Sequence, residues 1–122
     1  MHWTIIGGGI QGTTIAIKLR EAGISIQNLT IIDSHDSLCE QFHKYTNRID
    51  MSYLRSPIVH HIHPDPFHLK KFAKMNQYIN PTFGRYQRPQ TEMFMDHTYA
   101  QIHNYHLNQC HIQSYIQRIE KK

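Results

Sequence analysis

Residues 3–12 read WTIIGGGIQG, in which a short apolar run leads directly into the pattern G-x-G-x-x-G. Between a strand and a helix, this pattern is typical of a dinucleotide-binding turn, because the helix points its free backbone N–H groups and positive dipole end at a pyrophosphate. In this interpretation Gly7 forms the turn, Gly9 lets the backbone approach the phosphates, and Gly12 lets the helix pack closely on the strand. The candidate phosphate-binding residues of the turn are Gly7, Gly8, Gly9, Gln11 and Gly12.

The residues that follow predict a strand–helix–strand unit. A helix is expected over residues 11–22, and Gly23 supplies the left-handed stop that commonly follows a helix end. A second β-rich run follows over residues 29–32. The apolar positions expected to form one stripe of the helix are Ile15, Ala16, Leu19 and Ala22. We therefore predict the α/β class, with a partial Rossmann-like, doubly wound parallel sheet and a right-handed crossover. The alternative is a glycine turn that packs a helix on a sheet without a ligand.

Asp33 ends the second run, about 20 residues beyond the glycine turn, where an acidic side chain accepts hydrogen bonds from a ribose. An acid at this position argues against a cofactor with a 2′-phosphate. NAD and FAD both carry an adenosine with a free ribose, so this spacing does not separate them. Asp33 and the adjacent Ser34 are therefore candidate cofactor-binding residues.

The composition limits the function classes. The 122 residues suit a single domain over residues 1–122, and 39% hydrophobic residues suit a globular one. No run is long enough to span a bilayer, and the chain enters its first strand at once, so we expect a cytoplasmic protein without a membrane segment. The net charge is +4, but the basic residues are scattered along the chain and form no stripe, which argues against a nucleic-acid partner. Cys39 and Cys110 form no disulfide framework and are expected to be reduced thiols.

Two later helices are expected. Asp65 can cap one helix whose first residue is Pro66. Its core-facing positions are Leu69, Phe72 and Ala73. Residues 76–87 suit a loop, and Pro89 suits the start of a longer helix that reaches about residue 108. The apolar stripe of that helix is predicted to contain Met95, Tyr99, Ile102 and His106, with His97 and His103 in solvent.

The stretch MSYLRSPIVHH (residues 51–61) is the next distinctive feature. Together with the glycine turn, it resembles the N-terminal FAD domain of flavin-dependent monooxygenase-like proteins of the FAD/NAD(P)-binding class, whose best-known members are the lysine and ornithine N-hydroxylases. The matching segments, which extend the resemblance over nearly the whole chain, are Leu54-Arg55-Ser56-Pro57, His60-His61, Pro64-Asp65-Pro66 and Arg88-Pro89.

The resemblance implies that the glycine turn holds the FAD pyrophosphate and that Asp33 holds the adenosine ribose. It also implies that residues 53–61 lie along the flavin. Arg55 would then give charge-assisted hydrogen bonds to a diphosphate or a reduced flavin. A surface arginine in a loose salt bridge is the alternative. The spacing of apolar residues over residues 110–119 fits a helix and a strand equally. The resemblance favours a strand that joins the parallel sheet beside the first strand.

His60, His61 and His63 resemble a metal cluster only at first sight. On a strand only His61 and His63 share a face, and no suitably spaced ligand beyond Asp65 completes a tetrahedral set. We therefore predict no metal, and interpret these histidines as loop residues or as residues that position a substrate or the flavin.

Three functions remain open. The first is the FAD-binding portion of a longer monooxygenase-like oxidoreductase that uses NAD(P)H as co-substrate and is not catalytic alone, because no second glycine motif is present for the nicotinamide. The second is half of an oxidoreductase that a partner chain completes. The third is a non-redox module that binds NAD or FAD. A partner chain or self-association is also expected to cover the incomplete sheet.

Overall fold

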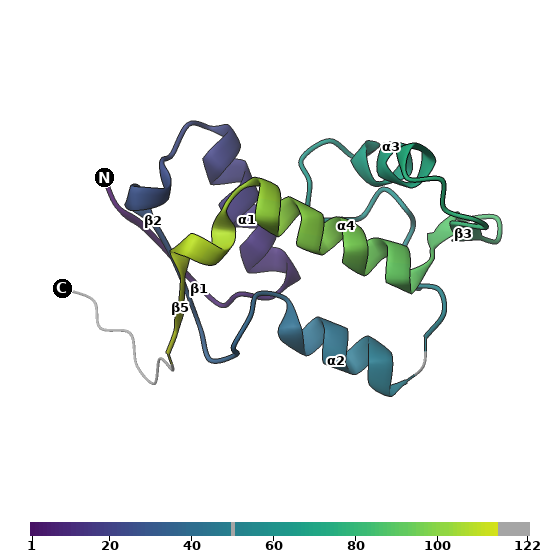
Figure 1. Ribbon diagram of the computed structural model, residues 1–122, viewed down its shortest axis with the longest axis horizontal. Coiled ribbons are helices and arrows are strands. Elements are labelled where there is room, and N and C mark those ends of the chain that lie inside the picture. The colour runs from purple at the N-terminus through teal and green to yellow at the C-terminus, as the bar shows by residue number, and fades with distance from the viewer. Residues whose placement is uncertain (50, 115–122) are drawn as a thin grey trace.

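The computed structural model describes residues 1–49 and 51–114 as a mixed α/β structure around a three-stranded parallel sheet (Figure 1). The strands are β1 (Trp3–Ile6), β2 (Leu29–Asp33) and β5 (His111–Gln113), in the order β1-β2-β5. Both neighbouring pairs are parallel, and Ile6 lies opposite Ile32 in the register. The predicted α/β class and parallel sheet are therefore confirmed. No helix among the described residues is long and apolar enough to cross a bilayer.

Helix α1 (Ile10–Glu21) connects β1 to β2, with the short helix η1 (Ile26–Asn28) before the second strand. The predicted stop at Gly23 is confirmed, because this residue adopts a φ of +97°. The N–H of Gly23 donates to the carbonyl of Arg20 and that of Ile24 to the carbonyl of Leu19, each over 3.0 Å. These two bonds form the Schellman motif that satisfies the last carbonyls of a helix.

The predicted stripe of α1 is confirmed only in part: Ala16 is buried and Leu19 packs against the core, but the buried face is rotated toward Thr13 and Ile17. The buried residues of the helix are Thr13, Ala16 and Ile17, whereas Ile15 is 51% exposed and Ala22 is also exposed. The contact that sets this phase is the close approach of the first turn of α1 to β1. It directs the residues one turn further along the helix toward the sheet.

The other elements follow in chain order. They are α2 (Glu40–Arg48), α3 (His68–Met75), β3 (Thr82–Phe83), β4 (Arg88–Pro89), α4 (Thr91–Asn104) and η2 (Leu107–Cys110). The burial of Leu69 and Ala73 on α3 is confirmed, and Phe72 is half-buried. Helix α3 nevertheless begins after Pro66, and Asp65 accepts the N–H of Phe67 in the preceding turn instead of capping the helix.

The segment predicted as a loop contains a strand. Within residues 76–87, β3 pairs antiparallel with β4 around a turn at Gly84, whose φ is +78°. Pro89 therefore lies in β4, and the following helix starts at Thr91 and ends at Asn104 instead of continuing to residue 108.

Strand β5 joins the sheet beside β2, and its predicted place beside the first strand is wrong. The reason lies in the segment before it. Helix η2 contacts both η1 and β2, and the Cys110 thiol lies 3.8 Å from the carbonyl of Ile26, so the chain arrives at the edge of β2. His111–Gln113 is a strand and not a helix, and residues 115–119 of this prediction lie outside the described residues.

In the part of the chain that the structure describes, helices cover only one face of the sheet. On the other face Ile6, Ile32 and Ile112 lie in one register row across the three strands. Ile6 is 53% and Ile112 52% exposed. The second helical layer of a doubly wound sheet is therefore absent from residues 1–49 and 51–114. We call this uncovered set the isoleucine row.

Helix α4 contacts α3 on one side and α2 on the other (Figure 1). This central position corrects the prediction for His97, which is 0% exposed and not solvated. Its Nε2 lies 2.8 Å from Nδ1 of His68 on α3. Met95 and Ile102 are buried and His103 is exposed, as predicted, whereas Tyr99 and His106 are exposed. A helix packed on two sides buries more than one stripe.

Gly12→Ala tests the approach of α1 to β1. A Cβ atom at Gly12 would lie 1.9 Å from the carbonyl oxygen of Gly7, so the helix must move away from the strand. We expect the free energy of unfolding to fall by about 3 kcal/mol, at the upper end for overpacked sites. Gly9→Ala is the matched control, since a Cβ there meets nothing within 4 Å and should change stability by less than about 0.5 kcal/mol. Urea denaturation measures both, and equal stability of the two variants would contradict this packing.

His97 predicts an acid-sensitive stability. Burial, aided by the nearby His61 and His68, lowers the pKa of His97 to about 3. Between pH 6.5 and that value the unfolded chain binds one more proton than the folded chain, so the free energy of unfolding falls as the pH falls. This residue contributes about 1.4 kcal/mol per pH unit. Urea denaturation between pH 7.5 and 5 should show a shallower pH slope for His97→Phe than for wild type, whereas the exposed-site control His103→Asn should keep the wild-type slope.

Candidate functional site

The glycine turn connects the end of β1 to the start of α1. Gly7 adopts a φ of +102°, and its N–H donates to the carbonyl of Ile32 over 2.7 Å, which ties the turn to β2. An L-residue rarely adopts this φ, so the backbone itself requires glycine here. The close contact between Gly12 and Gly7 likewise requires glycine at the first turn of the helix. The roles predicted for these two glycines agree with the geometry.

Gly8 is enclosed by protein. A Cβ at Gly8 would lie 2.7 Å from Leu38 Cδ2 and 3.1 Å from Asp33 Cβ. Its carbonyl accepts the N–H of Cys39 over 2.7 Å, so the segment before α2 packs on the turn. Gly8 therefore has a structural reason to be glycine, and it brings Asp33 next to the turn.

Gly9 differs from the other three glycines. It caps α1 with a φ of −78°, which any residue can adopt, and a Cβ there meets nothing within 4 Å. No side chain caps the N-terminus of α1, and its first turn contains no acidic residue. The described fold thus explains Gly7, Gly8 and Gly12 by conformation or packing, whereas Gly9 borders an open cavity at the uncapped start of α1.

Asp33 stands at the carboxyl end of β2, as predicted. Its carboxylate is half-buried, and Oδ2 lies 3.2 Å from Nδ1 of His35, a neighbour that the sequence analysis did not consider. The carbonyl of Ser34 accepts a hydrogen bond from Gln113 on β5. The side chain of Asp33 is thus beside the glycine turn, while the backbone of Ser34 is used to hold the neighbouring strand.

Two cavities flank the start of α1. The first, of about 720 Å³, is lined by Gly7, Gly9 and Gly12 and by Ile15, the residue that the helix turns away from the core. The second, of about 750 Å³, extends toward α4 and the loop that precedes α3. Four residues line both cavities, namely Ile10, Gln11, Phe42 and Tyr45. The two cavities therefore adjoin each other at Gln11, a residue of the predicted dinucleotide-binding turn.

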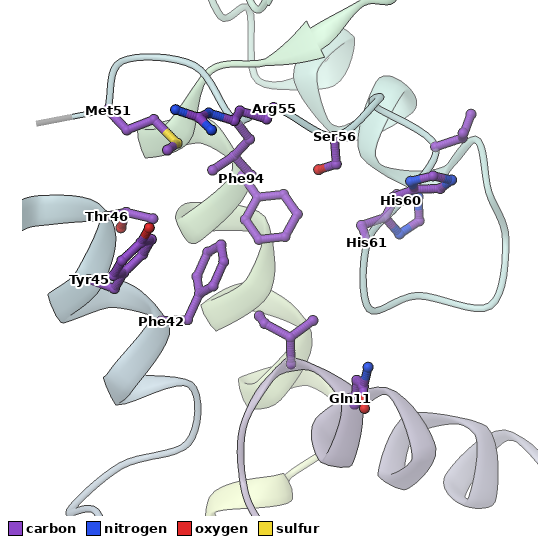
Figure 2. A pocket seen from close by; sticks show the side chains of 13 residues that line it. Gln11, Phe42, Tyr45, Thr46, Met51, Arg55, Ser56, His60, His61 and Phe94 are labelled. Atoms are coloured by element: carbon purple, nitrogen blue, oxygen red, sulfur yellow. The ribbon is translucent and has the colours of Figure 1, made fainter. Parts of the chain in front are cut away.

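The second cavity has aromatic walls (Figure 2). Phe42 on α2 and Phe94 on α4 point toward each other, with ring centroids 5.6 Å apart. Both belong to the cavity, and both were missed as site residues by the sequence analysis. Phe42 had a weak signal as an isolated apolar residue in a polar stretch, but nothing in the sequence indicated that it meets Phe94.

Arg55 is exposed at the rim of the second cavity, above Phe94 in Figure 2. Among the described residues no carboxylate forms an ion pair with it. The structure thus brings Arg55 and Gln11 to one cavity from segments far apart in the sequence. A guanidinium at this rim can give charge-assisted hydrogen bonds to an anionic or carbonyl group.

The three clustered histidines lie in a loop and not on a strand. His60 and His61 line the second cavity, whereas His63 stacks on His68, with ring centroids 3.6 Å apart. No group of three or more histidine, cysteine or acidic side chains within residues 1–49 and 51–114 is arranged to hold a metal ion.

Both cysteines are free and buried. Cys39 follows Leu38 with a left-handed φ of +63°, and its Sγ lies 3.5 Å from the hydroxyl of Thr13 on α1. Burial raises the pKa of the Cys39 thiol, so the thiol is protonated at neutral pH. Its role here is to pack the segment before α2 against the glycine turn.

The chain matches no protein-family model, no curated protein and no solved structure. The observations that bear on its function are therefore the glycine turn, the acid beside it and the two adjoining cavities.

Proposed function

We propose that the chain binds FAD through a Rossmann-like unit and serves as the dinucleotide-binding portion of a monooxygenase-like flavoprotein. The observation that carries the proposal is the environment of Gly9. It is the one glycine of the turn that neither its backbone conformation nor its packing requires, and it borders open space. An uncapped helix start with open space in front of it suits a pyrophosphate, because the phosphate oxygens then accept the free N–H groups.

The positions around the turn support a dinucleotide over a mononucleotide. Asp33 lies beside Gly8 on one side of the turn, where it would accept the ribose hydroxyls. The aromatic cavity adjoins the other side. Its volume and apolar walls suit a planar ring system, with Gln11 and Ser56 available for polar ring edges. Arg55 would add a charge-assisted bond at the rim.

Bound FAD would supply the electron-transfer chemistry, which no side chain of this site supplies alone. The residues of the chain would bind and orient the cofactor, with NAD(P)H as the co-substrate docked by other segments. We also propose a cytoplasmic location, and a partner chain or a second copy over the isoleucine row. A non-redox module that uses NAD or FAD is the second candidate, because Asp33 suits either adenosine.

Gly9→Val tests the site. A branched side chain at Gly9 would occupy the open space in front of α1, and we expect it to weaken FAD binding at least about 100-fold, since it removes most of the pyrophosphate interaction. Titration calorimetry of the apoprotein with FAD and with NAD measures this, and urea denaturation checks that the variant stays folded. Unchanged FAD affinity of Gly9→Val would contradict the assigned site, and tight binding of NAD without FAD would favour the second candidate.

Arg55→Gln tests the rim of the aromatic cavity. Loss of a hydrogen bond to a charged partner costs about 1.5–3 kcal/mol, so we expect FAD affinity to fall by about tenfold or more. Arg85→Gln is the matched control, because Arg85 is also exposed but lies on the β3–β4 turn, away from both cavities. If both variants bind FAD like wild type, Arg55 is a surface residue without a role in the site.

A further inference from the structure

The loop between the aromatic cavity and α3 is held by three hydrogen bonds of one kind. The side chains of His61, His63 and Asp65 each accept the backbone N–H of the residue two positions later. The lengths are 3.1 Å to His61 Nδ1, 3.0 Å to His63 Nδ1 and 3.0 Å to Asp65 Oδ1. An aspartate commonly makes such a turn, but two successive histidines in this role are unusual. We call this arrangement the histidine ladder.

The ladder fixes the protonation state of both imidazoles. A backbone N–H can only donate, so Nδ1 of His61 and Nδ1 of His63 must both be unprotonated. The Nε2 atoms then carry the hydrogens. Nε2 of His61 donates to the carbonyl of Pro66 over 3.0 Å, and Nε2 of His63 lies 3.1 Å from the hydroxyl of Tyr105. Every polar ring atom is thus satisfied in the neutral form.

A proton on either ring would break the ladder. The only ring nitrogen without a hydrogen is Nδ1, and once protonated it becomes a donor that faces a backbone N–H. Each protonated ring would lose one bond, so protonation of both rings would leave only the bond that Asp65 accepts. Because His61 and the adjacent His60 line the aromatic cavity, loosening this loop moves a wall of that cavity.

The titratable groups around the ladder come from the loop itself, from three helices and from the segment after α4. They are His60 and Asp65 in the loop itself, His68 and Lys71 on α3, His97 on α4, Glu21 on α1 and Tyr105 after α4. Glu21 accepts the hydroxyl hydrogen of Tyr105 and lies 3.9 Å from His63 Nε2. Burial is the largest effect and lowers the pKa of His61 and of His63, while Glu21 and Asp65 oppose it. The folded loop therefore favours neutral rings.

We propose that the histidine ladder is an acid-sensitive latch on the wall of the aromatic cavity, which releases the loop when His61 and His63 take up protons. Its effect on a ligand rests on the proposed FAD site, but the latch itself does not. Since these groups bind protons more weakly in the closed loop than in the released one, the closed state becomes progressively less stable as the pH falls below about 6.5.

A ligand-free experiment tests the latch. Imidazole ¹⁵N NMR spectra of the intact chain should show the Nε2–H tautomer for both ladder histidines at pH 7.5. Amide exchange at His63 and Asp65, corrected for intrinsic rates, should be protected at pH 7.5 and lose protection at pH 5.5. The amide of Phe67, which donates to Asp65, should lose less protection. An Nδ1–H tautomer of His63 at pH 7.5, or equal protection of the ladder amides at both pH values, would overturn the proposal.

His63→Asn tests the coupling to ligand binding. Asparagine still accepts the N–H of the residue two positions later but does not titrate. Wild-type FAD affinity should fall between pH 7.5 and 5.5, by about tenfold per pH unit for each proton taken up. The ratio of the FAD affinity at pH 7.5 to that at pH 5.5 should be smaller for His63→Asn than for wild type. The control His103→Asn should keep the wild-type ratio. Wild-type affinity that is equal at both pH values overturns the coupling. If FAD does not bind at pH 7.5, the proposed function fails, and the NMR measurement alone decides on the latch.

Discussion

The closest backbone approach around the site lies between Gly12, in the first turn of α1, and the carbonyl of Gly7 at the end of β1, where even a methyl group would come within 1.9 Å. This contact fixes both the distance and the rotation of the helix over the sheet. Thr13, Ala16 and Ile17 are buried as a result, and Ile15 is directed into the cavity beside the turn. The start of α1 thereby lies beside Asp33 on one side and the aromatic cavity on the other.

Helix α4 is the second support of the molecule. It provides Phe94 to the aromatic cavity and, one turn later, His97 to the contact with α3. The loop that carries the histidine ladder lies between these two contacts, since His61 both lines the cavity and packs its ring 5.2 Å from that of His97. Any movement of the loop therefore reaches the candidate site and the packing of α3 together.

The strand–turn–helix–strand unit could be predicted because it depends on local rules. A short apolar run, glycines at fixed offsets and a left-handed stop at Gly23 are visible without knowing the tertiary structure. The stripe of α1 was predicted only in part, because the contact at Gly12, and not the helix pattern, decides which residues are buried. His97 was missed because a helix enclosed on two sides buries polar positions as well.

Other features depend on long-range order that no short window contains. Strands β3 and β4 have two residues each, too few for a periodic signal. The place of β5 beside β2 follows from the contact of η2 with η1, and the facing pair Phe42 and Phe94 follows from the packing of α2 on α4. Of the candidate site, the glycine turn and Asp33 were accessible to sequence reasoning, and the aromatic walls were not.

The environment of Cys39 has a chemical consequence for the turn. Its thiol is shielded from solvent, contacts the Thr13 hydroxyl and is held in the protonated form by burial, so it is a weak nucleophile toward disulfides, peroxides and alkylating reagents. The cysteine whose backbone is bonded to Gly8 is therefore poorly reactive, so oxidation or alkylation of its thiol is not expected to disturb the turn under mild conditions.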